Sequence, residues 1–220
     1  MKKSILILAA HPDDEVLGCG GTILKYKDKG YQVFSVFFSD GVSSRSNIKK
    51  SDIKKRKDNS LAVAKKFKFK YYFEKLKDNQ FDSYSLLKIV KLIEKYIDKI
   101  NPEIVFTHSN KDLNIDHQKI FEAVCVAVRP QKKSNIKKVL SFEIPCSTHW
   151  NFKYNFQPNF FVDIGKYIDQ KMDMVSMYGD EIMPSPHPRS LENILNISKF
   201  RGNTFSIKNA EAFEIIYDFF

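Results

Sequence analysis

A regular alternation of short apolar runs with longer stretches of helical periodicity most constrains how this chain can fold. Residues 4–9, SILILA, form a continuous apolar run, and residues 16–29 follow with helical spacing and end at Gly30. A Val- and Phe-rich run over 32–40 comes next. Strands that alternate with helices pair in parallel through right-handed crossovers. The sequence therefore predicts a doubly wound α/β fold, with helices on both faces of a mostly parallel sheet.

The same alternation continues along the rest of the chain. The expected strands are 4–9, 32–40, 70–74, 103–107, 139–144 and 160–164. The expected helices are 16–29, 49–67, 83–100, 117–128, about 166–178, and one from about Leu191. No repeat, low-complexity tract or linker divides the sequence, so residues 1–220 are expected to form a single Rossmann-like domain. In a strand order 3-2-1-4-5, the loops after the first and fourth strands face each other where the winding reverses.

Composition limits the class of protein. The chain has 220 residues, of which 43% are hydrophobic and 28% charged, which is typical of a globular domain and not of a disordered one. No run approaches the roughly 18 apolar residues of a membrane span. The N-terminal MKKSILILAA has two lysines before apolar residues, as a signal peptide has, but the run is short and leads into charged residues, which favours a first strand. Three widely spaced cysteines, without CxxC spacing, predict reduced thiols and a cytoplasmic protein.

The formal net charge is +10, which raises the question of a nucleic-acid partner. Only five of the 36 basic residues are arginine, and many lysines alternate with acidic residues in helical stretches. A solvated lysine-rich surface accounts for this pattern, so no nucleic acid is expected. Anionic substrates and membrane headgroups stay open as alternatives.

The stretch AHPDDE, residues 10–15, places an imidazole and three carboxylates directly after the first apolar run. His11 and Asp14 lie three residues apart on a tight turn and can point at one cation. The best-placed third ligand is His117, in DLNIDH after the fourth strand. Two histidines and one carboxylate, with open positions for water, suit catalytic zinc or iron(II).

More than one role is open for the acidic residues that lie beside these candidate ligands in the sequence. Asp13 need not bind the metal, and its position suits a general base acting on metal-bound water. Alternatively, Asp13 and Asp14 cap the following helix and Asp116 caps the next one, although capping does not account for a histidine at both places. Glu15 needs no role beyond stabilising the first helical turn.

Three glycines, Gly18, Gly20 and Gly21, follow the carboxylates. Their spacing is not GxGxxG, and carboxylates at this turn would repel a pyrophosphate. A nucleotide cofactor is therefore not expected, and close helix–sheet packing explains the glycines better.

The motifs AHPDDEVLGCGGT and DLNIDH are joined by weaker ones that extend over nearly the whole chain: SDG (39–41), SFEIPCSTHW (141–150), PNFFVDI (158–164), HPRS (187–190) and RG (201–202). Together they resemble the PIG-L/LmbE-like family of zinc-dependent N-deacetylases. Members of this family remove acetyl groups from N-acetylglucosamine units in glycolipids, thiol-cofactor precursors, antibiotics and nucleotide sugars. The resemblance implies a hydrolase that removes an N-acetyl group from a small or lipid-linked amino-sugar substrate, with peripheral membrane contact in the second case.

The resemblance also implies roles for single residues. It gives His11, Asp14 and His117 as the zinc ligands and Asp13 as the base that activates zinc-bound water. Asp116 matches the acid before the third ligand, which orients or tunes its neighbours.

Two further residues are candidates for contact with the substrate, one because of the resemblance and one because it lies at the end of an expected strand. Arg56 resembles the sugar-contacting arginine of the family, with a surface arginine of a lysine-rich helix as the alternative. Asp40 could hold a sugar hydroxyl or simply form the turn before Gly41.

One position departs from the family pattern. Members often carry HxDH, and here Asn114 replaces the first histidine. Asparagine can donate a hydrogen bond to an oxyanion but cannot supply a proton. The leaving amine then takes its proton from Asp13 or from His149, whose alternative is a surface role. Arg189 and Arg201 could hold a phosphate or be structural.

Other functions share parts of this pattern. A metallohydrolase of another amide or ester would use the same ligands and base. A non-enzymatic carbohydrate-binding or nucleic-acid-binding protein would use the basic surface but has no need of the clustered histidines and aspartates.

Overall fold

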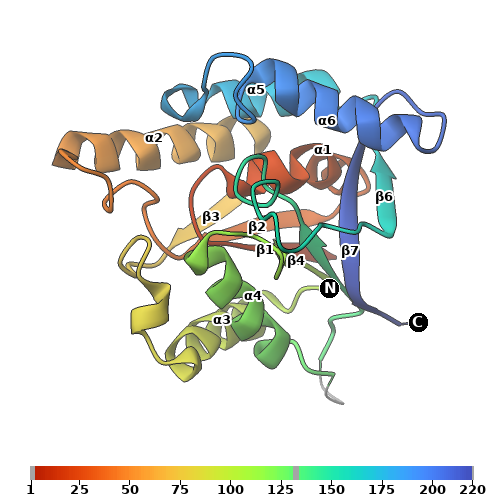
Figure 1. Ribbon diagram of the computed structural model, residues 1–220. Helices are drawn as coiled ribbons and strands as arrows, with labels where there is room; N and C mark the ends of the chain where they lie inside the picture. The colour runs from red at the N-terminus through yellow and green to blue at the C-terminus, as the bar shows by residue number, and fades with distance from the viewer. Residues whose placement is uncertain (1–2, 131–133, 220) are drawn as a thin grey trace.

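A seven-stranded sheet forms the middle layer of the computed structural model, which describes residues 3–130 and 134–219 (Figure 1). The strand order is β3-β2-β1-β4-β5-β7-β6. The strands are β1 (Ser4–Ala9), β2 (Gln32–Phe37), β3 (Lys70–Phe73), β4 (Ile104–His108), β5 (Lys138–Phe142), β6 (Phe160–Asp163) and β7 (Ala210–Asp218). Strands β1 to β5 pair in parallel, and β7 runs antiparallel to both β5 and β6. The first five strands have the order 3-2-1-4-5 considered from the sequence, and an antiparallel pair is added at one edge.

Helices cover both faces of the sheet. They are α1 (Asp14–Asp28), α2 (Lys50–Phe67), α3 (Leu86–Ile100), α4 (Ile115–Ala127), α5 (Ile168–Ser176) and α6 (Leu191–Asn203), with short 3₁₀ turns η1 (Phe81–Ser83) and η2 (Gly179–Glu181). Helices α3 and α4 pack on one face, and the other four lie on the opposite face (Figure 1).

The central strand β1 is apolar from Ile5 onward because both of its faces are covered. Ile5 and Ile7 join the core under α1, whereas Leu6 and Leu8 join the core under α3 and α4. A continuous apolar run is the pattern expected of a strand buried on both sides.

Two expectations about strands need correction. The final strand β7 is absent from the sequence prediction, which closes the chain with the helix from Leu191. β2 ends at Phe37 and does not extend to residue 40, because the N–H groups of Phe38 and Ser39 turn to the carbonyl of Ala10 at 3.2 and 2.9 Å.

The glycines of α1 permit close packing, as predicted. A Cβ atom on Gly18 would lie 2.3 Å from Cδ2 of Phe142 on β5, and one on Gly21 would lie 2.8 Å from Ile164. Any larger residue at either place would push α1 away from the sheet.

Two global expectations can be compared with the structure. Across residues 3–130 and 134–219, no helix combines the length and apolar character needed to cross a membrane. The three cysteines are free thiols, as predicted.

Candidate metal centre

The segments that follow β1 and β4 meet at one edge of the sheet because these strands are neighbours. The first segment carries His11 and leads into α1. The second leads into α4, where the side chain of Asn114 accepts hydrogen bonds from the N–H groups of Asp116 at 2.8 Å and His117 at 3.4 Å. Asn114 is thus the residue that caps α4, and the capping alternative for Asp116 is wrong.

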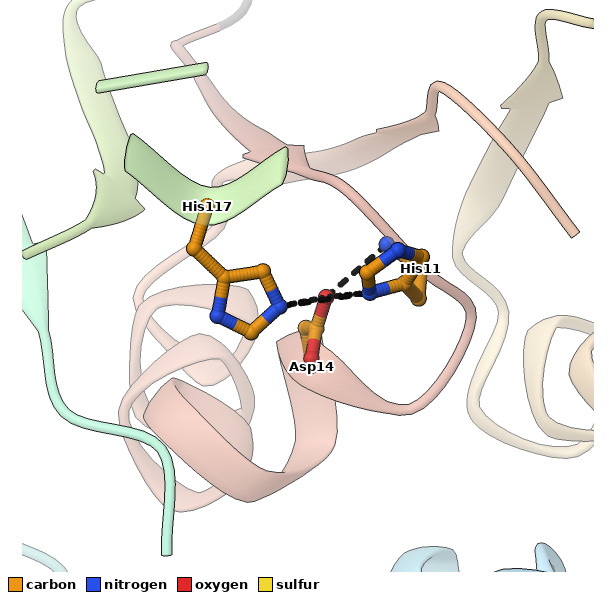
Figure 2. A group of neighbouring side chains, drawn as sticks. All are labelled: His11, Asp14 and His117. Atoms are coloured by element: carbon orange, nitrogen blue, oxygen red, sulfur yellow. Dashed lines mark hydrogen bonds and ion pairs between the residues drawn. The ribbon is translucent and has the colours of Figure 1, made fainter. Parts of the chain in front are cut away.

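His11, Asp14 and His117 converge as a triangle of ligand atoms (Figure 2). Nδ1 of His11 and Nε2 of His117 lie 3.2 Å apart, and Oδ2 of Asp14 lies 3.5 Å from each of them. Atoms bound about 2.0–2.1 Å from a tetrahedral zinc are separated by about 3.3–3.4 Å. The spacing of this buried triangle therefore fits zinc.

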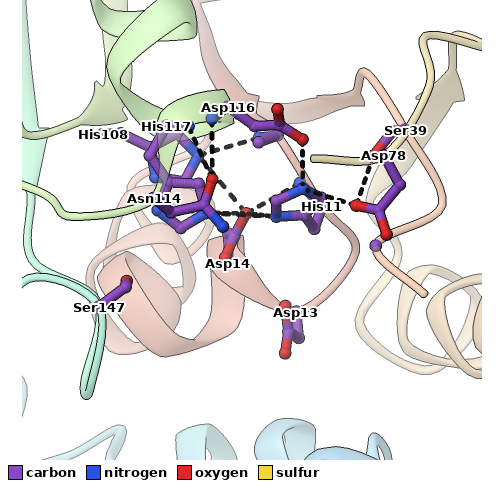
Figure 3. Close-up of polar contacts among 12 residues, drawn as sticks. His11, Asp13, Asp14, Ser39, Asp78, His108, Asn114, Asp116, His117 and Ser147 are labelled. Atoms are coloured by element: carbon purple, nitrogen blue, oxygen red, sulfur yellow. Dashed lines mark hydrogen bonds and ion pairs between the residues drawn. The ribbon is translucent and has the colours of Figure 1, made fainter. Parts of the chain in front are cut away.

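The other ring nitrogen of His11 faces two carboxylates (Figure 3). Nε2 lies 3.1 Å from Oδ2 of Asp116 and 3.2 Å from Oδ1 of Asp78. Asp116 is itself fixed by two backbone N–H groups of segment 79–81. Burial alone would lower the pKa of His11, but Asp116, Asp14 and Asp78 outweigh it and raise this pKa well above its usual value. The carboxylates hold a proton on Nε2, which leaves Nδ1 to face the metal position.

His117 has a matching carboxylate partner. Its Nδ1 lies 3.1 Å from Oδ2 of Asp112, which also accepts hydrogen bonds from the hydroxyl groups of Ser147 and Thr148. Burial alone would lower the pKa of His117, but Asp112 and Asp14 raise it to about 9. Each candidate histidine ligand is therefore oriented through its far nitrogen by an anchored carboxylate.

A third histidine, His108, lies beneath the ligands without being one of them. It is the last residue of β4, it is fully buried, and its ring stacks on His117 with 3.8 Å between centroids. Nε2 lies 3.4 Å from Asp14 but accepts a hydrogen bond from the N–H of Ala10 at 2.9 Å. Burial and the neighbouring His117 lower its pKa well below the usual value. The lone pair of Nε2 of His108 is therefore used by the backbone of the loop after β1. The His108 ring supports His117 by stacking on it.

Asp13 lies outside the histidine network (Figure 3) and has an unusual backbone. Its φ of 115° is in the left-handed region, and its side chain makes no capping hydrogen bond, so the capping alternative is wrong here too. Oδ1 lies 2.9 Å from Nη2 of Arg56, and Oδ2 lies 2.6 Å from Nη2 of Arg189. A strained conformation held by several partners is common at functional sites.

Glu15 holds that backbone in place, which corrects the minor role expected for it. Its Oε2 accepts a hydrogen bond from the N–H of Asp13 at 3.0 Å. Its Oε1 accepts from the hydroxyl groups of Tyr71 at 3.0 Å and Tyr178 at 2.8 Å. Glu15 is fully buried, and burial raises its pKa to about 7. It therefore connects the Asp13 turn to β3 and to the segment before η2.

Around Asp13, three arginines and Glu181 form what we call the arginine cluster. Oε1 of Glu181 lies 2.5 Å from Nη1 of Arg56, and Oε2 lies 2.8 Å from Nη2 of Arg45 and 3.4 Å from Nη1 of Arg189. The cluster consists of Arg45, Arg56, Arg189, Asp13 and Glu181. Glu181 and Asp13 each pair with more than one arginine, which fixes Arg56 and Arg189 against the base candidate.

The metal centre and the arginine cluster open on one cavity of about 290 Å³. Its lining includes the three candidate ligands together with Asp13, Asn114, Arg45, Arg56 and Arg189. The structure thus brings together the residues predicted as ligands, base and oxyanion donor and one predicted substrate contact.

Two other predicted site residues lie elsewhere. Asp40 accepts hydrogen bonds from two backbone N–H groups of its own turn, as the turn interpretation expects, and does not line this cavity. His149 lies 2.9 Å from Glu143, which also receives two hydrogen bonds from Arg201. Neither His149 nor Arg201 lines the cavity.

Several residues of the site were not expected from the sequence. Asp112 begins the DLNIDH motif, so its place in the motif was an available signal. Asp78 and Glu181 come from loops with no recognisable pattern, and only the folded chain brings them to the site.

Comparison with known proteins assigns the family. The PIG-L family model, described as GlcNAc-PI de-N-acetylase, matches residues 6–128, which include all three candidate ligands. This chain therefore belongs to the PIG-L family, as the resemblance of its motifs implied.

Among curated proteins, the "Uncharacterized deacetylase YaiS" of Escherichia coli (strain K12) is 26% identical over 171 residues, covering 74% of this chain and 83% of that protein. Similar solved structures include the conserved protein TT1542 from Thermus thermophilus, with TM-score 0.81, 20% identity and coverage of 100% of this chain and 97% of that one.

Two further structures carry named activities. The N,N'-diacetylchitobiose deacetylase from Pyrococcus horikoshii has TM-score 0.77 and 22% identity, with 98% and 84% of the two chains covered. GalB, the 4-carboxy-2-hydroxymuconate hydratase of Pseudomonas putida KT2440, has TM-score 0.75 and 21% identity, with 99% and 98% covered. The fold is therefore shared by deacetylases and by a hydratase.

Proposed function

We propose that this protein is a metal-dependent N-deacetylase that removes an acetyl group from an amino-sugar substrate. Membership of the PIG-L family supports the class of reaction. The observation that carries the proposal is one cavity lined by two histidines and a carboxylate at metal-ligand spacing and by an adjacent, anchored carboxylate. These are the groups that hydrolysis of an amide requires.

We propose zinc as the metal, with iron(II) as the alternative that the same ligands accept. His11, Asp14 and His117 would hold it, since their ligand atoms already have the separation of a tetrahedral site. When bound, zinc supplies a Lewis acid for the acetamide carbonyl and lowers the pKa of water toward neutrality. Metal analysis of the purified protein tests this assignment.

Asp13 is the proposed general base. Arg56 and Arg189 fix the direction of its carboxylate, and each oxygen keeps a further lone pair for an incoming water. Asp13 takes a proton from the attacking water and passes it to the leaving amine. His149 contributes less to this step because it faces Glu143 outside the cavity lining.

Asn114 is the proposed oxyanion donor. Its Oδ1 accepts hydrogen bonds from the start of α4, so its amide NH₂ is the free end of the side chain. Asn114 lines the cavity, and its NH₂ can donate to the oxygen that becomes negatively charged. Asp116 acts indirectly, by orienting the ring of His11.

Arg56 is the proposed sugar contact, since it lines the cavity and lies beside the base. Asp40 is a weaker proposal because its carboxylate is used within its own turn. We further propose a cytoplasmic location, which the three free thiols support.

A second candidate is water addition to an unsaturated acid, favoured by the similarity of fold to GalB. It would use the same ligands and a base but no acetamide. Hydrolysis of a different amide or of an ester is the third alternative.

Acetate release tests these candidates. The panel should contain free N-acetylated sugars, nucleotide sugars, and a glycolipid headgroup presented on vesicles, together with an unsaturated hydroxy acid, each with and without chelator. We expect chelator-sensitive acetate release from at least one amino sugar, and the vesicle arm tests the membrane contact that a lipid-linked substrate needs. Zinc-loaded protein that hydrates the unsaturated acid and releases no acetate would overturn the proposal.

A further inference from the structure

The arginine cluster carries more positive than negative charge. Three guanidinium groups, those of Arg45, Arg56 and Arg189, share only two carboxylates, those of Asp13 and Glu181. One positive charge is therefore left without a counter-charge inside the cluster. This excess lies on a cavity wall and not on the outer lysine-rich surface.

The arginines also have unused hydrogen-bond donors. Nε of Arg56 and Nε of Arg189 are buried and have no hydrogen-bond partner among the residues described. Arg45 uses Nη2 for Glu181 and for the carbonyl of Gly41 at 3.3 Å, and its side chain stays 45% exposed. Buried donors without partners are uncommon in native proteins, and each calls for an explanation such as a bound ion or water or a functional role.

The loop that carries Arg45 begins at the metal centre. Gly41 has a φ of +72°, and a Cβ atom there would lie 2.8 Å from Cβ of His11. Four residues later the loop reaches Arg45, which pairs with Glu181, the carboxylate shared with Arg56 and Arg189. All three arginines line the same cavity as the candidate ligands, so the part of a substrate beyond an acetamide at His11 can reach them.

Guanidinium groups favour one class of ligand. Their planar arrays of N–H donors match the oxygens of phosphate and carboxylate groups, and burial strengthens such pairs. Two acids besides Glu181 contact this loop. Asp78 is occupied by His11 and by the backbone and hydroxyl groups of Ser44, and Asp40 accepts hydrogen bonds from the N–H groups of Val42 and Ser43. Among the ion pairs of the described residues, Arg45 pairs with Glu181 and with neither of these aspartates.

We propose that the outer part of the cavity binds an oxyanion carried by the substrate, a phosphate or a carboxylate attached to the N-acetylated amino sugar. Arg45 and Arg189 are its donors, and Arg56 supplies the remaining charge. The identity of the substrate rests on the proposed deacetylase function, but the anion site itself does not depend on it. The outcome is a specificity for charged over neutral amino sugars.

Substrate preference gives the first test. The value of kcat/KM is measured for N-acetylglucosamine, for its phosphate esters, and for an N-acetylated amino sugar that bears a carboxylate. We expect the charged substrates to be preferred, and Arg45→Gln to lower the ratio of charged to neutral kcat/KM by about 10- to 100-fold, the usual loss for a hydrogen bond to a charged group. The phosphate and carboxylate arms identify which oxyanion is recognised. Arg129→Gln, which removes an exposed arginine at the end of α4, is the matched control and should leave the ratio unchanged.

Direct binding gives the second test. Titration calorimetry with inorganic phosphate is carried out on zinc-loaded and on metal-free protein, because phosphate bound only through the metal would disappear in the second. We expect phosphate to bind the metal-free protein, and we expect Arg45→Gln but not Arg129→Gln to abolish that binding.

The two tests separate the inference from the proposed function. Acetate release with equal kcat/KM for neutral and charged sugars, and no phosphate binding to metal-free protein, would overturn the anion site and leave the deacetylase intact. Phosphate binding that depends on Arg45, without acetate release from any sugar, would support the anion site and overturn the proposed function.

Discussion

The metal centre and the arginine cluster are two largely buried polar groups on one cavity, with Arg45 of the cluster partly exposed, and their charges are unbalanced in opposite directions. The metal centre combines three histidines, His11, His108 and His117, with four aspartates, Asp14, Asp78, Asp112 and Asp116. The arginine cluster combines three guanidinium groups with two carboxylates. Buried charge is costly unless it is paired, so each region is completed by the charge that it lacks. The first is built for a cation and the second for an anion.

The difference also extends to how the charge is held. In the metal centre, carboxylates orient rings whose other nitrogen faces the ligand position. In the arginine cluster, Glu181 and Asp13 fix the guanidinium groups directly. Asp13 belongs to the arginine cluster by its contacts and follows the ligand His11 closely in the sequence, so the proposed base lies at the boundary between the two regions.

Removing a metal ligand should have the largest effect. His117→Ala takes away one corner of the ligand triangle, so we expect zinc content to fall below stoichiometry and acetate release to disappear. Metal analysis of protein whose circular dichroism matches the wild type checks this. His149→Ala, a histidine outside the cavity, should keep its zinc, and unchanged zinc in His117→Ala would contradict the ligand assignment.

Removing the proposed base, Asp13, should have the second-largest effect. Asp13→Ala leaves the ligand triangle intact, so we expect stoichiometric zinc with kcat reduced by about 10²–10⁴-fold, the usual contribution of general-base catalysis. Paired measurements of zinc content and turnover check it. Wild-type turnover in metal-loaded Asp13→Ala would show that Asp13 is not the general base.

Weakening the orientation of a ligand should have a smaller effect. Asp112→Asn keeps the size of the side chain but removes the charge beside Nδ1 of His117, and losses of about 10- to 100-fold in metal affinity are usual for such partners. Competition with a chelator of known affinity measures this. Ser176→Ala, at the exposed end of α5, provides a control that should not change the affinity. An Asp112→Asn protein with wild-type affinity would show that orientation by this carboxylate is dispensable.

The two regions should also differ in their response to pH. The pKa of His117 is raised to about 9, although burial alone would lower it, because Asp112 and Asp14 favour the protonated ring. Zinc binds the neutral ring, so below this pKa it must displace a proton. We expect zinc affinity to rise with pH at least up to about 9, because His117 and also His11, whose pKa is raised as well, give up a proton to zinc, and calorimetry in buffers of different ionisation enthalpy counts the protons released.

Sulfate binding at the arginine cluster provides the contrast. Arginine does not titrate in this range, so sulfate affinity should stay flat between about pH 7 and 9. A flat zinc profile would contradict the assignment of His117, and a steep sulfate profile would show that another titrating group controls the cluster.

The smallest effect is expected at Glu15. In Glu15→Gln, the amide cannot accept from all three donors that the carboxylate serves, so one buried donor loses its partner, at a cost of about 1–3 kcal/mol in the free energy of unfolding. We expect a lower Tm and a modest fall in kcat with unchanged zinc. Tyr178→Phe removes a donor and not the acceptor, so it should affect turnover less. Equal turnover in Glu15→Gln and wild type would show that the Asp13 turn holds its shape without this carboxylate.

Much of the fold could be predicted because its signals are local. β1 and the helix that follows it are visible in the period of their apolar residues, and parallel pairing of the strands follows from their alternation with helices. β7 could not be predicted in this way because its pattern is interrupted by Glu211, a buried charge. That carboxylate is paired with Lys171 at 2.6 Å and accepts from the N–H groups of Gly21 and Thr22, partners that only the folded chain supplies.

The residues of the site also divide into those that the sequence indicates and those that only the folded structure reveals. The three ligand candidates and Asp13 lie in two short motifs, so residue type and spacing indicate them. Asp78 and Glu181 reach the site from separate loops, and nothing near them in the sequence indicates a partner. The turn that occupies Asp40 was one of the two interpretations left open by the sequence, whereas the pairing of His149 with Glu143 could not be inferred from either residue alone.

The position of the arginine cluster along the chain has a consequence for how this protein could diversify. All three candidate ligands lie within residues 6–128, the part matched by the family model, together with Asp13, Arg45 and Arg56 of the arginine cluster. Glu181 and Arg189 lie beyond it and complete the cluster from the C-terminal third. Substitutions at these two positions would alter the charge of the cavity wall without changing a candidate ligand.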